Sequence, residues 1–210
     1  MKGSDLDTRQ WDTGAGVDRL LATAEKLFAA RGIHGVGVAE IARDAGMSKS
    51  NVFHHFATKE SLYLAVLKNA GKRMTAAGKE SPEAQETSLE GLRLRFANQL
   101  SRLLDDQQAT RLVLRELLDH GSQHSKELAE EIYASAFARL VASVRSTQAS
   151  GELSATVDPG LIAFLLLAAN VFSVQAKGLF AHIHDAAFTL DPEAYAAAVF
   201  DVVVGGVASR

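Results

Sequence analysis

The stretch VAEIARDAGMSKSNVFHHFATKESL, residues 38–62, predicts two short helices joined by a tight turn, with a third helix directly after them. Ile41 and Ala45 lie four residues apart, so they share one side of the first helix. Gly46 follows, where glycine can adopt the positive φ of a turn without steric cost. Ser48 is placed to cap the second helix. This combination is typical of a helix-turn-helix, the motif that places its second helix in the major groove.

The second helix of this motif has a polar face and an apolar face. Val52 and Phe56 are four residues apart and are expected to point inward. The outward positions are Lys49, Ser50, Asn51 and His54.

Three patterns resemble the TetR family of bacterial transcriptional repressors. They are I-A-x-x-A-G-hydrophobic-S at residues 41–48, aromatic-His-His-Phe at 53–56, and Lys59-Glu60 at the start of the next helix. A preceding helix that ends in FAARG, residues 28–32, also fits, and the resemblance covers residues 17–72. It implies an all-α fold of about nine helices, with an N-terminal three-helix DNA-binding unit containing the helix-turn-helix. A C-terminal helical bundle would bind a ligand and form the dimer.

The resemblance also implies which side chains contact DNA. The base-reading residues would be Lys49, Ser50, Asn51 and Phe53, and the phosphate contacts would be Ser48, His54, His55 and Lys59. The sequence departs from the family pattern in two places. Val36-Gly37 replaces the usual Thr or Ser that caps the first helix of the motif, and Phe53 replaces the usual tyrosine. Each change is expected to weaken phosphate anchoring by about 1 kcal/mol.

Composition and charge fit a DNA-binding protein once the chain is divided. The 210 residues are 47% hydrophobic and 22% charged, as in an ordinary soluble protein, and the absence of cysteine excludes disulfides and thiolate metal sites. Net charge is −3, yet residues 17–74 hold nine Lys/Arg against five Asp/Glu, a surplus of four positive charges. The basic charge therefore coincides with the motif, as phosphate binding requires. Residues 1–16 are polar and lack the pattern of a signal peptide, so a cytoplasmic location is expected.

The rest of the chain has helical patterning without sustained period-two alternation. Ser81-Pro82, Asp158-Pro159 and Asp191-Pro192 each pair a capping residue with proline at the first helical position, and Thr87 with Glu90 has capping-box spacing. The predicted domains are a mobile arm (1–16), the DNA-binding domain (17–60) and the ligand-binding and dimerisation domain (61–210). The predicted helices span residues 17–31, 38–45, 49–55, 59–77, 88–106, 109–119, 124–149, 159–182 and 192–207.

The last two of these helices are apolar around most of their circumference, which predicts burial on more than one side. A membrane span is disfavoured because polar residues, from Asn170 to Lys177, interrupt the first of them before about 18 apolar residues accumulate. The TetR resemblance implies a dimer interface here instead. The candidate interface residues are Phe164, Ala168, Phe172, Ala197 and Val203.

Asn170 and Lys177 are seven residues apart and share a face of an otherwise apolar helix. Two interpretations remain open: the polar stripe lines a ligand cavity and binds an acidic or hydroxylated molecule, or it faces water or the other subunit. The candidate pocket residues are Phe96, Leu100, Tyr133, Phe137, Phe164, Asn170, Phe172 and Lys177.

Other chemistries have weaker support. His120 with His124, and His182 with His184 and Asp185, do not form a complete ligand set with known spacing. No phosphate loop or nucleophile motif is present, so we expect no enzyme activity, metal or cofactor. The expected function is a DNA-binding repressor, a homodimer released from operator DNA by a small molecule. The alternatives are a TetR-fold protein controlled by a protein partner, and a helical ligand carrier or enzyme.

Overall fold

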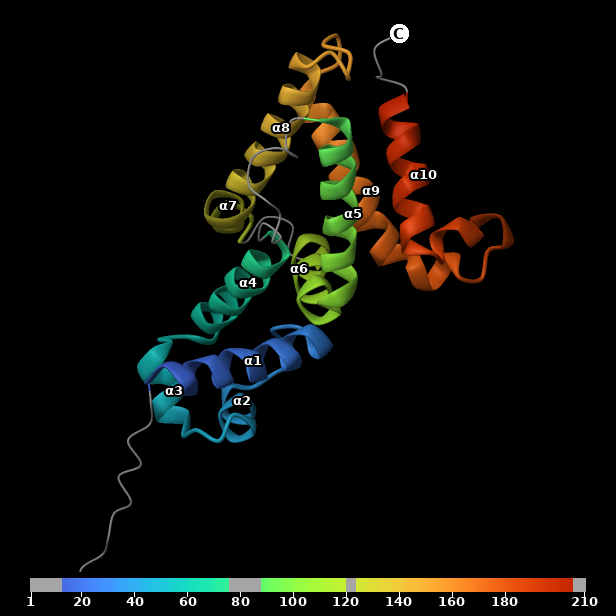
Figure 1. Cartoon of the computed structure of the whole chain (residues 1–210). Coiled ribbons are helices and arrows are strands. Elements are labelled where there is room, and N and C mark those ends of the chain that lie inside the picture. Colours follow the sequence, from blue (N-terminus) through green and yellow to red (C-terminus); the bar gives the residue numbers. More distant parts are fainter. Residues whose placement is uncertain (1–12, 76–87, 120–123, 206–210) are drawn as a thin grey trace, which may run out of the picture. The chain divides into compact units, whose positions relative to one another are not determined.

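The computed structural model describes residues 13–75, 88–119 and 124–205, and within these ranges the chain is helical and contains no strand (Figure 1). The chain divides into two compact units, Met1–Leu67 and Lys68–Arg210. The helices are α1 (Thr13–Arg31), α2 (Val38–Asp44), α3 (Lys49–His55), α4 (Lys59–Thr75), α5 (Leu89–Asp105), α6 (Gln107–Asp119), α7 (Ser125–Leu128), α8 (Ala134–Ala149), α9 (Pro159–Phe180) and α10 (Pro192–Gly205), with a π-helical turn at Ala129–Tyr133 and a 3-10 helix, η2, at His184–Thr189.

The N-terminal unit has a small apolar core. Leu20 and Phe28 of α1, Ile41 of α2 and Val52 of α3 are all buried. Phe28 meets Tyr63 of α4 edge to face, with ring centroids 5.1 Å apart. The inward positions predicted for Ile41 and Val52 are therefore confirmed, whereas Phe56, also predicted to point inward, is only half-buried.

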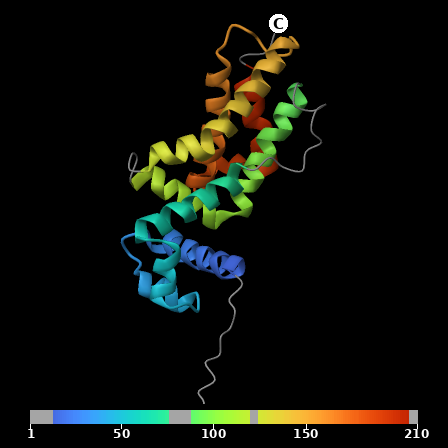
Figure 2. The same cartoon turned by 90° about the vertical axis from the view of Figure 1, so that its left-hand side faces the viewer.

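In the C-terminal unit, α5 packs against α9 and α10, and α9 packs against α8 (Figure 2). The core lies between these helices and includes Leu92 and Phe96 of α5, Ile162 and Leu166 of α9, and Phe200 of α10. Phe96 and Phe200 are in ring contact, with centroids 6.0 Å apart. This core fixes the side of α9 that carries Leu166 and the candidate pocket residue Asn170.

Two of the three proline-marked helix starts are confirmed. The Asp158 side chain accepts a hydrogen bond from Leu161 N at 2.9 Å, with Pro159 in the first turn of α9. Asp191 accepts hydrogen bonds from Glu193 N and Ala194 N at the start of α10. The Ser81-Pro82 pair lies outside the described residues.

The start of α5 differs from the Thr87 capping box expected from the sequence. Ser88 is the N-cap, and its side chain accepts a hydrogen bond from Gly91 N at 3.1 Å. Thr87 lies three residues before Glu90, and Ser88 lies three residues before Gly91, so each hydroxyl has the spacing of an N-cap. The spacing alone could not distinguish them.

Two other predictions need correction. The arm predicted at residues 1–16 overlaps α1, which begins at Thr13; residues 1–12 lie outside the described part of the chain. The single helix predicted at 124–149 is interrupted by the π-helical turn at Ala129–Tyr133. A π-turn adds a residue to one turn without changing the apolar spacing enough to be visible in the sequence.

Helix α9 has the length and composition of a membrane span, with a mean hydropathy of 1.7. The polar residues between Asn170 and Lys177 were expected to make this helix too polar for a membrane span, but its mean hydropathy remains high enough for one. One of them, Asn170, is fully buried and donates a hydrogen bond to the Phe96 carbonyl of α5 at 2.9 Å. One face of α9 thus packs into the helical bundle.

Candidate nucleic-acid interface

Backbone geometry at the two ends of the turn fixes the helix-turn-helix. Gly46 has φ +66°, the left-handed conformation predicted for it. Ser48 is the N-cap of α3, and its Oγ accepts a hydrogen bond from Asn51 N at 3.1 Å. Gly37 caps α2 in an extended conformation without a side-chain hydrogen bond. As expected from the sequence, α2 therefore has no side-chain hydroxyl that caps its first turn.

The first turn of α3 forms an exposed polar surface. Lys49 and Ser50 are exposed, and Asn51 is half-buried. Phe53 is 40% exposed, and the Lys49 ammonium lies 5.7 Å from the centre of its ring. This distance is within the range of a cation–π interaction. The phenyl group at the position where tyrosine is usual in the family thus restrains a candidate base-reading side chain.

The other candidate phosphate-contact residues of the motif also lie on the surface. Ser48 and His54 are exposed and His55 is half-buried. The rings of His54 and His55 meet edge to face, with centroids 5.5 Å apart. Their position at the end of α3 leaves N–H groups available to an anion.

Lys59 is bonded within the domain. Its ammonium donates a hydrogen bond to the Ile33 carbonyl at 3.0 Å and approaches the Val36 carbonyl at 3.5 Å. The side chain is half-buried and joins the start of α4 to the loop between α1 and α2. A phosphate contact by Lys59 remains a prediction, since an ammonium has three donors.

Sequence reasoning missed the cap of α4. Thr58 Oγ1 accepts a hydrogen bond from Ser61 N at 3.0 Å, and Ser61 Oγ accepts one from Thr58 N at 3.1 Å. This reciprocal pair is a capping box with serine in place of the usual Glu or Gln. The Thr-x-x-Ser spacing just before an apolar helix was the available signal.

The eight residues predicted for a ligand pocket do not surround one cavity in the described part of the chain. Phe96 and Asn170 are buried in the core, and Phe137 packs against it. Phe164 and Phe172 are 57% and 62% exposed. The reason is helical geometry: positions 164 and 172 lie on the side of α9 opposite Leu166 and Asn170.

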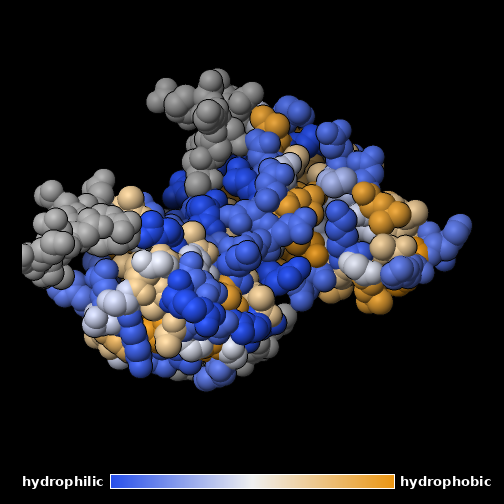
Figure 3. Space-filling model, turned by 90° about the horizontal axis from the view of Figure 1, so that it is seen from below, coloured by the Kyte–Doolittle hydropathy of each residue, from blue (hydrophilic) through white to orange (hydrophobic). Residues whose placement is uncertain are grey.

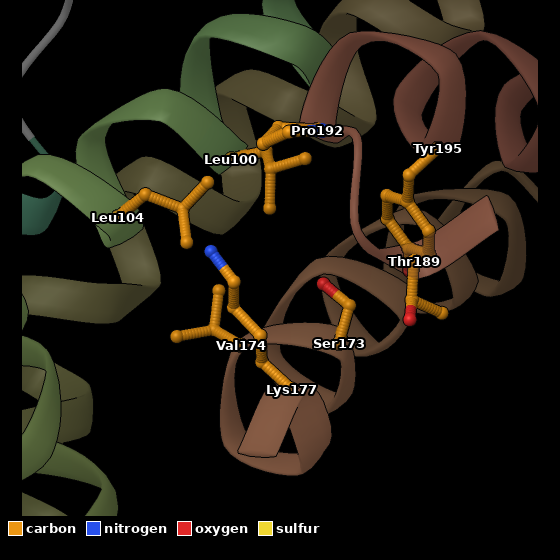
Figure 4. Close-up of a pocket in the computed structure, with 8 residues that line it drawn as sticks. All are labelled: Leu100, Leu104, Ser173, Val174, Lys177, Thr189, Pro192 and Tyr195. Atoms are coloured by element: carbon orange, nitrogen blue, oxygen red, sulfur yellow. The ribbon is translucent and has the colours of Figure 1, made fainter. Parts of the chain in front are cut away.

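Two of the eight, Leu100 and Lys177, line a small hollow that opens to solvent (Figure 4). Sequence reasoning missed its other residues, although Ser173 lies one turn from Lys177 on the same face. Burial raises the pKa of Tyr195 above its usual value, and a hydrogen bond with Ser173 offsets only part of this increase. The lining residues are Leu100, Leu104, Ser173, Val174, Lys177, Thr189, Pro192 and Tyr195.

Tyr133 lies elsewhere, in the π-helical turn. A methyl group built on Gly71 of α4 would come within 3.2 Å of the Tyr133 hydroxyl and 2.9 Å of Ile132 Cδ1. The hydroxyl is buried and has no hydrogen-bond partner among the residues that the structure describes. Burial raises the pKa of Tyr133 to about 12.

The candidate dimer residues form part of an apolar surface. Phe164 and Phe172 are exposed on α9, Ala168 lies half-buried between them, Ala197 is exposed on α10, and Val203 is half-buried against the core. Further large exposed apolar side chains lie on α9 and on the segment that joins it to α10, which appears at the right of Figure 3. They are Leu161, Leu165, Leu179, Ile183, Phe188 and Leu190.

The histidine pairs do not form a metal site in the described residues, where no three His, Asp or Glu side chains converge. His124 Nδ1 lies 2.8 Å from Glu116 Oε1, and His184 pairs with Asp185 at 3.3 Å. His120 lies outside the described ranges.

Residues 20–66 match the model of the bacterial regulatory proteins of the tetR family. Over 49 residues the chain is 49% identical to the HTH-type transcriptional activator FasR from Mycolicibacterium smegmatis. The matched segment covers 23% of this chain and 22% of FasR. The chain thus aligns with less than a quarter of that relative's length.

Solved structures extend the likeness of the fold beyond this segment. FadR from Bacillus subtilis, solved with stearoyl-CoA, has a TM-score of 0.71 and 20% identity, covering 91% of this chain and 99% of FadR. SCO4942 from Streptomyces coelicolor has a TM-score of 0.69 and 22% identity, covering 91% and 98%. The sequence match over residues 20–66 and the likeness of the whole fold both point to regulators of the same kind. Residues 20–66 thus carry the DNA-binding segment of the tetR family of bacterial regulatory proteins, within an all-helical fold that the solved regulators share.

Proposed function

We propose that the protein is a ligand-responsive repressor that binds operator DNA as a homodimer in the cytoplasm. The observation that carries this proposal is the first turn of α3. There Lys49, Ser50 and Asn51 occupy the surface of a helix whose N-terminus is capped by Ser48 and whose other face is packed. A rigid helix with exposed donors and acceptors is suited to the major groove.

Within this proposal the side chains have separate roles. Lys49 donates to guanine O6 and N7, and Asn51 pairs with adenine through its amide. Ser48, His54 and His55 contact phosphates, which fix the position of the helix without reading sequence. Phe53 holds Lys49 and contacts the bases through its ring edge.

The homodimer would form through α9 and α10. On α9 the exposed or half-buried positions 161, 165, 168, 172 and 179 lie on one side of the helix, which would otherwise expose a continuous apolar stripe to water. A second copy covers this stripe by the same surface, as two-fold symmetry requires. The dimer then presents two α3 helices to two half-sites of a palindromic operator.

Effector control requires a link between the two units. Helix α4 supplies it, because this one helix runs from Lys59 in the first unit to Thr75 in the second. In the second unit its Lys68 pairs with Glu131 at 2.6 Å, beside the close contact of Gly71 with Ile132. A small molecule that alters this packing changes the position of α4 and thereby the affinity for DNA.

Equilibrium binding tests the proposal. Sedimentation of a duplex operator with increasing protein should show two chains per operator, and a reporter gene downstream should be silenced by the protein. An effector should lower operator affinity by the factor by which operator lowers effector affinity, typically about 5- to 150-fold. One chain per operator, or a reporter switched on by the protein, would contradict the dimer or the repressor role respectively.

A further inference from the structure

Helix α4 approaches the π-helical turn at Ala129–Tyr133 most closely at a residue without a side chain, Gly71. A methyl group built on Gly71 would lie 2.9 Å from Ile132 Cδ1 and 3.2 Å from the Tyr133 hydroxyl. The turn therefore places two consecutive side chains against one position of α4. Single π-turns within α-helices are frequent at functional sites, so this contact is a candidate for a functional element.

The Tyr133 hydroxyl is buried at this contact, and no described residue forms a hydrogen bond with it. A hydroxyl that leaves water without finding a new partner has an energetic cost, typically equivalent to a factor of about 5 to 150 in an equilibrium. That cost applies only while α4 lies against the turn. If α4 moves away, water can reach the hydroxyl and the cost disappears.

The polar contacts of α4 with the same unit lie at the surface. Lys68 pairs with Glu131 at 2.6 Å and Arg73 pairs with Asp106 at 2.8 Å, and all four side chains are at least a quarter exposed. Pairs of this kind contribute little to stability, and their long side chains can follow a moving helix. They keep α4 close to the unit without fixing it in one position.

We propose that α4 and the π-helical turn have two arrangements, and that the Tyr133 hydroxyl sets the balance between them. In the described arrangement Gly71 lies against the turn and the hydroxyl is unpaired. In the second arrangement α4 has withdrawn and the hydroxyl is hydrated. One of the two binds operator DNA, because α4 continues into the first unit. This inference rests on the proposed function and names the element on which an effector would act.

Two substitutions shift this balance in opposite directions. Gly71→Ala adds a methyl group close to Ile132 and therefore favours the second arrangement. Tyr133→Phe removes the unpaired hydroxyl, so it favours the described arrangement. These directions are the same whichever arrangement binds DNA.

Operator affinity of the full-length variants tests the proposal, with the duplex that the wild type enriches from a random library as the probe. Gly71→Ala should change the Kd by about 5-fold or more, and Tyr133→Phe added to it should return the Kd toward that of the wild type. Gly178→Ala in α9 is the matched control and should bind like the wild type, since nothing lies within 4 Å of its added methyl group. An unchanged Kd for Gly71→Ala, or a change that Tyr133→Phe enlarges, would overturn the proposal.

NMR of the isoleucine methyl groups provides a second measurement, which the wild type alone can supply if Gly71→Ala folds poorly. The chain has five isoleucines, so the spectrum is simple, and Ile132 reports on the contact with Gly71. Operator DNA should shift the Ile132 δ1 signal in the wild type or in Gly71→Ala, whose starting balances differ. Ile162, which is buried in the core between α5, α9 and α10, should not respond. An Ile132 signal that operator leaves unchanged in both proteins would contradict the two arrangements.

The same experiments separate this inference from the proposed function. If the wild type binds its operator while Gly71→Ala behaves like Gly178→Ala and Ile132 does not respond, only the inference is refuted. A wild type that enriches no duplex refutes the proposed regulator and this inference with it.

Discussion

The ammonium of Lys59 donates a hydrogen bond to the carbonyl of Ile33 at 3.0 Å, across 26 residues of sequence. This bond ties the first residue of α4 to the loop that separates α1 from α2. The helix that joins the two units is therefore anchored at the same point where the helix-turn-helix begins. A residue expected to touch only DNA thus also stabilises the unit that reads it.

Substitution of Lys59 by methionine should lower the free energy of unfolding of the DNA-binding unit by about 1 kcal/mol, because two carbonyls lose a charged donor. Urea denaturation measures this change. The slope of log affinity against log salt should fall by less than the roughly two units that loss of one free phosphate contact per subunit would cause. Unchanged stability together with a full fall of two would show that Lys59 acts only on phosphate.

Substitution of Asn51 by alanine should cost about 1–3 kcal/mol of operator affinity and relax the preference at one base pair in each half-site. The backbone N–H of residue 51 still bonds to Ser48, so α3 should remain folded. Fluorescence anisotropy with single-base operator variants gives both quantities. Ser48→Ala is the contrasting change: it removes the cap, costs about 1 kcal/mol of stability and should weaken all sequences alike.

Phe53→Tyr should leave operator affinity unchanged or raise it, because it restores a hydroxyl near the backbone of DNA while the ring still holds Lys49. Phe53→Ala should lower affinity, since Lys49 then loses its restraint. Competition binding against the wild-type protein compares the variants. Equal affinities for alanine and tyrosine at this position would show that the ring has no role.

Gly71→Ala should destabilise the C-terminal unit by about 1–3 kcal/mol, because the added methyl would lie 2.9 Å from Ile132 Cδ1. Gly178→Ala in α9 is the matched control. Nothing lies within 4 Å of its added methyl, so helix propensity should stabilise it by about 0.5–1 kcal/mol. Thermal unfolding of both variants checks the sign; two changes of the same sign would contradict the close packing of α4.

Tyr133→Phe should raise the free energy of unfolding by about 1 kcal/mol, because the removed hydroxyl is buried and no described residue forms a hydrogen bond with it. The pKa of Tyr133 is raised above its unfolded value near 10, so its protonated form favours the folded state. That contribution is complete below pH 10 and is lost as pH rises toward about 12. Urea denaturation from pH 8 to 11 should therefore show a steeper loss for the wild type than for the variant.

Phe172→Asp should give a folded monomer, because the side chain is exposed in the protomer and would be covered only by a second copy. Ala197→Asp should act in the same way, whereas Val203→Asp should also strain the core against which Val203 packs, at a cost of several kcal/mol. Analytical ultracentrifugation and circular dichroism distinguish the outcomes. A stable dimer of the Phe172→Asp chain would place the interface elsewhere.

The sequence predicted best what depends on local chemistry. The positive φ of Gly46, the cap by Ser48 and the starts of α9 and α10 all follow from single residues and their immediate neighbours. The all-helical fold followed from periodicity and from the family resemblance.

What the sequence could not predict depends on contacts between distant segments. The Lys59 bond to Ile33 and the contact of Gly71 with Ile132 join residues far apart in the chain. The hollow beside Lys177 required the register between α5, α9 and α10, so aromatic residues that were expected to line a pocket proved to be core or exposed surface.

Selection of DNA duplexes from a random library by the full-length protein, near physiological salt, tests the central claim most directly. The account predicts enrichment of a palindrome whose half-sites are separated by about one helical turn or a multiple of it. The Asn51→Ala protein, selected in parallel, should lose its preference at one position of each half-site. Enrichment of no sequence, or of sites without two-fold symmetry, would contradict a homodimer that reads DNA through α3.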